Sequence, residues 1–151
     1  MLKVRRLLCV VLLAGASFIS YPATASDTTF FAILDGGNEV SPGGQANAGD
    51  RNGYGSASVV FLSDGQLCFS IISMLLNQLP TAAHIHRAPA GVNGPIVVTL
   101  APPNDATAGT SRGCRTIAPA LGSEIRQNPR RFYINVHTPP FPNGAIRGQL
   151  F

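Results

Sequence analysis

Apolar and polar residues alternate with a period of two along most of this 151-residue chain, and this pattern limits the possible folds more than any other feature. Strand-type segments recur between clusters of Gly, Pro, Asn and Asp, as expected for short strands joined by turns. The expected strands are Thr28–Leu34, a hairpin within residues 56–73, Ala82–Arg87, Ile96–Leu100, Gly113–Ile117, Phe132–His137 and Ala145–Phe151. Only Leu121–Asn128 has a helical pattern. The sequence therefore predicts an all-β fold, an antiparallel sandwich or barrel, with one short helix.

The first hairpin is marked by Asp64-Gly65, a pair that suits a two-residue turn. Such a turn would pair Leu62 with Leu67 and Val60 with Phe69. Those four residues, with Ile71, would then share the core face. Cys68 would lie on the opposite face beside Phe61.

The N-terminus has the three-part pattern of a secretory signal. Lys3, Arg5 and Arg6 precede the 13-residue apolar run Leu7–Ile19, and Ala23-Thr24-Ala25 follows as a small-x-small cleavage site. A run of this length is short of the ~20 residues that span a bilayer. We therefore expect a signal peptide over residues 1–25, cleaved near Ala25, and one domain over residues 26–151 that is secreted or periplasmic and carries no membrane span.

Removing residues 1–25 changes the charge of the chain. The remainder carries eight Arg, no Lys and all seven acidic residues, so its formal charge is +1 rather than +4. A charge this small excludes the basic surface of a nucleic-acid-binding protein.

Two cysteines, Cys68 and Cys114, remain outside the predicted signal. An exported chain with two cysteines most simply forms one disulfide. The alternative, a redox-active pair, lacks the C-x-x-C spacing that lowers a thiol pKa. We therefore predict a structural bridge.

The three histidines of the chain are restricted to two predicted strands. Residues i and i+2 of a strand point to the same side, so His84 and His86 project together, away from Ile85. His137 projects away from the apolar face of its own strand. If the two strands are neighbours, the imidazoles converge and could hold Zn or Cu. The alternative is that these histidines form hydrogen bonds with loop backbone and stabilise the adjacent turns.

Candidate supporting residues lie on the same faces. If residues 138–144 form the last loop, His137 faces Ala145 and Asn135 faces Arg147, so Asn135 and Arg147 could orient His137 or carry an anionic ligand. A plain cross-strand polar pair is the favoured interpretation. Glu39 could pair with Arg147 or accept a hydrogen bond from a histidine, although on its own it is expected to be a solvated loop carboxylate.

Several enzyme motifs are missing from the sequence. The chain contains no G-x-S-x-G elbow, no P-loop and no H-E-x-x-H motif. Its acidic residues are dispersed, and no Ser/His/Asp set can be singled out. No catalytic residue is therefore predicted.

Three separated segments carry a resemblance to a known family. They are Ala83–Val98 (AHIHRAPAGVNGPIVV), Tyr133–Thr138 (YINVHT) and Gly144–Leu150 (GAIRGQL). Together they resemble the CHRD domain, which is named from chordin, an extracellular antagonist of bone morphogenetic proteins, and which also occurs in secreted bacterial proteins. The two cysteines and residues 125–129 are similar to bacterial single-domain members.

The resemblance implies a fold and an extracytoplasmic location rather than a reaction. The implied fold is an antiparallel β-sandwich, an immunoglobulin-like or superoxide-dismutase-like Greek key, with one short helix. The recurring histidine positions of the family map onto His84, His86 and His137. A weaker likeness is to copper–zinc superoxide dismutases, but those enzymes use more histidines than this chain has, so only a mononuclear three-histidine copper site remains possible.

The sequence is compatible with three functions. The leading prediction is a binding module that holds Cu or Zn, or that binds an extracellular protein or matrix component. The alternatives are a small copper-dependent oxidoreductase and a purely structural module of the envelope or matrix. A module without catalytic activity is favoured over an enzyme, and the sequence leaves the oligomeric state open.

Overall fold

The computed structural model describes residues 27–151 except residues 63–64 and 106–108. The predicted signal peptide, and Asp64 of the predicted hairpin turn, lie outside these described residues. Eight strands and one short helix follow one another along the chain: β1 (Thr28–Asp35), β2 (Tyr54–Phe61), β3 (Gln66–Met74), β4 (Ala82–Arg87), β5 (Ile96–Leu100), β6 (Thr110–Thr116), α1 (Pro119–Gln127), β7 (Phe132–Thr138) and β8 (Phe141–Gln149). Short 3-10 turns precede β2 and β7, at Gly36–Asn38 and Pro129–Arg131.

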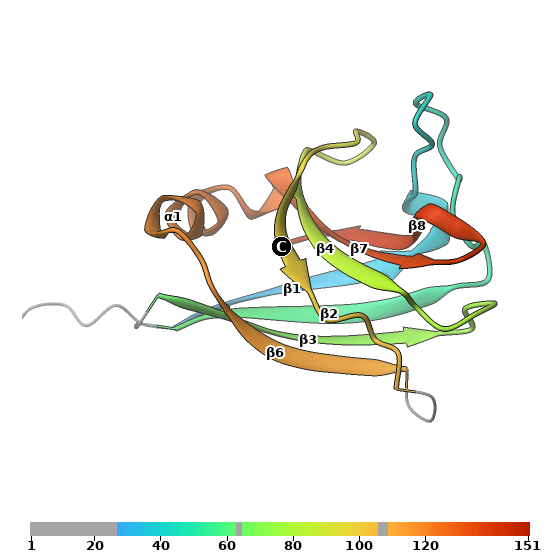
Figure 1. The fold of residues 1–151 in the computed structure, drawn as a ribbon. Coiled ribbons are helices and arrows are strands. Elements are labelled where there is room, and N and C mark those ends of the chain that lie inside the picture. Colours follow the sequence, from blue (N-terminus) through green and yellow to red (C-terminus); the bar gives the residue numbers. More distant parts are fainter. Residues whose placement is uncertain (1–26, 63–64, 106–108) are drawn as a thin grey trace, which may run out of the picture.

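The strands form one antiparallel sheet in the order β5-β4-β7-β8-β1-β2-β3-β6. The sheet folds over on itself, so that β1, β2, β3 and β6 make one layer and β4, β7 and β8 face it from the other side, with α1 at one end (Figure 1). Apolar side chains from both layers fill the space between them, including Val59, Ile71, Ile85 and Ile134. The predicted all-β fold with one short helix is therefore confirmed.

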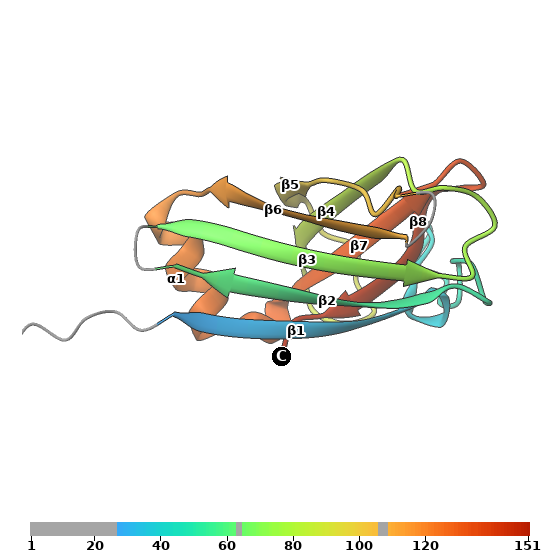
Figure 2. The same ribbon diagram turned by 90° about the horizontal axis from the view of Figure 1, so that it is seen from below.

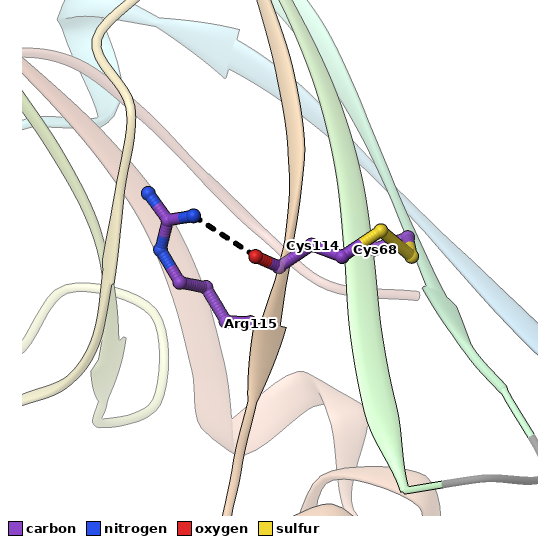
Figure 3. Close-up of a disulfide and its surroundings, with 3 residues drawn as sticks. All are labelled: Cys68, Cys114 and Arg115. Atoms are coloured by element: carbon purple, nitrogen blue, oxygen red, sulfur yellow. Dashed lines mark hydrogen bonds between the residues drawn. A yellow bond between two sulfur atoms is a disulfide. The ribbon is translucent and has the colours of Figure 1, made fainter.

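The two edge strands of the folded sheet approach each other. Arg115 on β6 donates from Nε to the carbonyl oxygen of Thr99 on β5, at 3.0 Å, and from Nη1 to the carbonyl oxygen of Cys114, at 2.9 Å. Figure 3 shows the Arg115 side chain on the opposite side of β6 from the Cys114 sulfur. The bond to Thr99 helps to close the sandwich along that edge.

Cys68 and Cys114 are register partners on β3 and β6, and they form the predicted disulfide (Figure 3). The bridge joins residues 46 positions apart in the sequence. It therefore ties the last strand of one layer to its neighbour on the outer face of the sheet.

The register of the first hairpin differs by one residue from the prediction. Val60 pairs with Cys68, and Val59 rather than Val60 pairs with Phe69. Gly65 donates to the Leu62 carbonyl, and Leu62 donates to the Gln66 carbonyl, so the loop holds three residues rather than two. Gly65 has φ of +85°, which suits the glycine position of a three-residue hairpin loop.

This one-residue shift exchanges the two faces of β2. Ala57, Val59 and Phe61 are buried with Leu67, Phe69 and Ile71, whereas Val60 and Leu62 are only half-buried. Placing Val60 and Leu62 in the core was therefore wrong, as was placing Phe61 beside Cys68.

Some element ends also differ from the prediction. β6 begins at Thr110 rather than Gly113, and β8 begins at Phe141 rather than Ala145. Thr138 pairs with Phe141, so the last turn is shorter than the predicted loop.

Among the described residues, no helix has the length and apolar character needed to span a membrane.

Candidate metal site

Strands β4 and β7 are neighbours, and this pairing brings the three histidines together. His84 pairs with Asn135, His86 with Tyr133, and Ala82 with His137, so His137 lies diagonally across from His84. Between the two β4 histidines, Ile85 is fully buried in the core. All three imidazoles therefore occupy the face of the sheet that points away from the apolar core, as the alternation predicted.

The imidazole rings contact one another. His84 Nδ1 lies 3.1 Å from His137 Nε2. Ring centroids are 4.9 Å apart for His84 and His137, 5.6 Å for His84 and His86, and 6.3 Å for His86 and His137. One ring nitrogen from each residue lies within 4.8 Å of the other two. The three side chains therefore form one cluster that could hold a metal ion.

Backbone carbonyls determine which ring nitrogen of two histidines keeps its lone pair. Nδ1 of His86 is 2.9 Å from the Gly94 carbonyl oxygen, and Nδ1 of His137 is 3.1 Å from that of Pro142. A carbonyl oxygen only accepts, so both Nδ1 atoms carry hydrogen and both Nε2 atoms keep a lone pair. The hydrogen bonds to loop backbone therefore exist together with the cluster, and such bonds orient histidines that bind metals.

His86 is the most enclosed of the three and has an unused acceptor. Its side chain is 8% exposed, and its Nε2 is buried without a hydrogen-bond partner among the described residues. A buried polar atom without a partner costs free energy unless something binds it. His86 Nε2 is therefore the atom of the cluster that gains most from a bound cation.

The environment keeps the imidazoles neutral. Burial, together with the neighbouring charges of His137 and His86, lowers the pKa of His84 to about 4. Burial also lowers the pKa of His86 and of His137, against the opposing effect of their carbonyl hydrogen bonds. Neutral imidazole is the form that coordinates a metal.

The spacing can be compared with metal coordination. Imidazole nitrogens bind zinc at ~2.0–2.1 Å, which places two tetrahedral ligand atoms about 3.3 Å apart. The 3.1 Å between His84 Nδ1 and His137 Nε2 is close to this value. Three protein ligands would leave a fourth coordination position open.

The His86 ring stacks on Tyr133, which is not among the site residues predicted from the sequence. The rings of His86 and Tyr133 are 4.8 Å apart with 6° between their planes. The Arg147 guanidinium lies over the same Tyr133 ring, also at 4.8 Å. The contact of Tyr133 with His86 depends on the pairing of β4 with β7.

Arg147 forms its hydrogen bonds with loop residues and lies near Glu39. Arg147 donates from Nε to the Asn38 carbonyl and from Nη1 to Asn93 Oδ1, and its Nε is 3.9 Å from Glu39 Oε2. No hydrogen bond joins Arg147 to a histidine within the described chain. The suggestion that Arg147 orients His137 therefore finds no contact in its favour.

Glu39 is buried, and the expectation of a solvated loop carboxylate is wrong. Its side chain is 1% exposed. Burial raises the pKa of Glu39 to about 8, although the nearby charge of Arg147 and the Asn135 side chain act in the opposite direction. Asn135 lies between this pair and the histidines, since it is the register partner of both His84 and Arg147.

Two loops cover this polar layer. Asn93 donates to the carbonyl oxygens of Val40 and Ser41, and the Gly94 amide donates to the Tyr133 hydroxyl. Both loops rise from the same side of the sheet (Figure 1). No local pattern in the sequence shows that Asn93 and Gly94 cover a histidine cluster.

Comparison with known proteins identifies the family. The CHRD domain family model matches residues 30–150. Searches of curated proteins and of solved structures found no match. The matched residues include all eight strands in whole or in part, together with the three histidines and the disulfide. The chain therefore belongs to the CHRD domain family.

Proposed function

We propose that this protein binds a transition metal ion, Cu(II) or Zn(II), through His84, His86 and His137. The observation that carries the proposal is the cluster itself: three neutral imidazoles with ligand nitrogens within 4.8 Å, one of them a buried lone pair without a partner. Imidazole suits both ions, and the usual order of affinities favours Cu(II) over Zn(II).

The proposal includes export. The N-terminal sequence has the pattern of a cleaved signal, and the Cys68–Cys114 disulfide suits an oxidising compartment. The domain would then act outside the cytoplasm as a metal-binding module, with one coordination position left for water or for a group from another molecule.

The test uses residues 26–151 without a histidine tag. Elemental analysis after Cu(II) or Zn(II) loading and desalting should find close to one ion per chain. Isothermal titration should show at least tenfold weaker binding for His137→Ala. The spectrum of the Cu(II) form should show nitrogen coordination that changes in the same variant.

The matched control is Arg87→Ala, which alters an exposed β4 residue directly beside His86. This variant should bind metal as tightly as the parent. Equal affinity of His137→Ala and the parent, with both folded by circular dichroism, would refute the proposed site.

A further inference from the structure

The outer face of β1, β2 and β3 is apolar, and no other element of the described part of the chain covers it. In Figure 2 these strands, with β6, lie in front of the rest of the molecule. Large apolar side chains about half exposed gather there: Phe31, Ile33, Tyr54, Ile72, Met74 and Phe151. Phe151 belongs to this group because its backbone pairs with that of Phe31, with the two rings 6.5 Å apart.

The large and small side chains on this face are arranged in rows across the strands. Register places Phe31, Ser58 and Ser70 in one row across the three strands, and Ile33, Ser56 and Ile72 in the next. Small serines on β2 therefore lie beside large side chains on β1, and Ser56 also lies beside Ile72 on β3. The result is a hollow of about 230 Å³ lined by these six residues and the backbone beneath them.

Charged side chains are nearly absent from the face. Of the outward positions of β1, β2 and β3, only Asp35 is charged, and it lies at the end of β1. Arg112 on β6 continues the row of Phe31 at the opposite edge. Apolar centres with charges at the rim are typical of protein–protein interfaces.

We propose that this face joins two copies of the chain in a symmetric dimer, with the two-fold axis running along β2. Rotation about that axis places β1 over the partner's β3, and Phe31 then enters the hollow above the partner subunit's Ser70. By symmetry the same contact forms twice, which is the self-complementarity that a two-fold interface needs. The small Ser56 and Ser58 lie near the axis, where two packed sheets must approach most closely.

The available area supports a dimer of moderate strength. Six large side chains that are each about half exposed present roughly 600 Å² of apolar surface per copy. A standard interface takes ~800 Å² from each partner. We therefore expect a dimer that forms at micromolar or higher concentration rather than an obligate one.

Sedimentation velocity of residues 26–151 across a wide concentration range tests the proposal. The parent should shift from monomer to dimer as concentration rises. Ile33→Arg should remain monomeric throughout, because Ile33 is 63% exposed and the change places a charge in the interface without disturbing the core. Val92→Arg, at an apolar residue 49% exposed on a distant loop, should dimerise like the parent.

A second variant tests the position of the axis. Ser58→Cys places a thiol next to its own copy, so a short bis-maleimide should cross-link the dimer efficiently, and far less so when Ile33→Arg is added. A parent that stays monomeric at the highest concentration would overturn the proposal, and so would unchanged dimerisation of Ile33→Arg. Because neither variant touches a histidine, metal binding should be retained whatever the result.

Discussion

The imidazole of His86 lies flat against the ring of Tyr133, with ring centroids 4.8 Å apart and 6° between the planes. His86 also donates to the Gly94 carbonyl, while Tyr133 accepts from the Gly94 amide. Both rings are therefore held by the same loop residue. The stack fixes the direction in which the His86 lone pair points.

Replacing Tyr133 should weaken metal binding even though Tyr133 is not a proposed ligand. Aromatic stacking contributes ~0.5–1.5 kcal/mol, so Tyr133→Leu should lower affinity about 2- to 13-fold in isothermal titration. Tyr133→Phe keeps the ring and should lose less. Equal effects of the two substitutions would show that the ring does not orient His86.

The metal-free protein should lose stability in acid partly through its histidines. Folding lowers the pKa of all three imidazoles, so the unfolded chain binds more protons below pH ~6.5. Their contribution is complete above that pH and declines as pH falls toward about 4, the pKa of folded His84. Urea unfolding at several pH values should show a smaller decline for His84→Gln. Parallel curves for variant and parent would contradict the expectation.

Glu39 should make the stability of the folded protein fall as pH rises from 4.5 to about 8. Its pKa is raised from 4.5 to about 8 in the folded state, so the stabilising effect of its proton is present below pH 4.5 and is lost as pH rises to about 8. Glu39→Gln cannot lose this proton, so its stability relative to the parent should increase across that window. The control is Glu124→Gln, at a glutamate whose side chain is 39% exposed, and this variant should show no such trend. A constant difference between Glu39→Gln and the parent would rule out the raised pKa.

The disulfide should contribute substantially to stability. Closing a loop of 46 residues restricts the unfolded chain by ~4 kcal/mol in the chain-entropy model, and measured values are often lower. Denaturation of the double variant Cys68→Ala/Cys114→Ala should show a loss of about 2–4 kcal/mol in the free energy of unfolding.

In residues 26–151 a thiol assay under non-reducing conditions should find no free thiol. Two reactive thiols per chain would contradict the bridge.

The alternation of apolar and polar residues predicted the direction in which each histidine side chain points. In β4 it placed His84 and His86 opposite Ile85, and in β7 it placed His137 opposite Val136. The pairing of Asn135 with Arg147 was also predicted correctly, although the last turn is shorter than expected and the register shifts between Val136 and Thr138. The direction of each histidine depends only on strand period.

The register of β2 with β3 could not be read from the sequence in the same way. Val59, Val60, Phe61 and Leu62 form a continuous apolar run, so neither face of β2 was marked as the core face. The length of the loop decided the pairing, and a change of one residue in that length reverses every side chain of the strand.

The sequence alone determined the strands, the one short helix, the direction of each histidine and the pairing of the two cysteines, because these follow from local period and from simple counts. Only the tertiary structure decided that β4 lies beside β7, that two loops cover the outer face of those strands, and that Glu39 is buried beside Arg147. Such contacts join residues tens of positions apart, as the 109 positions between Asn38 and Arg147 show. No local pattern encodes a contact of that kind, since its free energy arises only when the sheet has closed and water has been excluded.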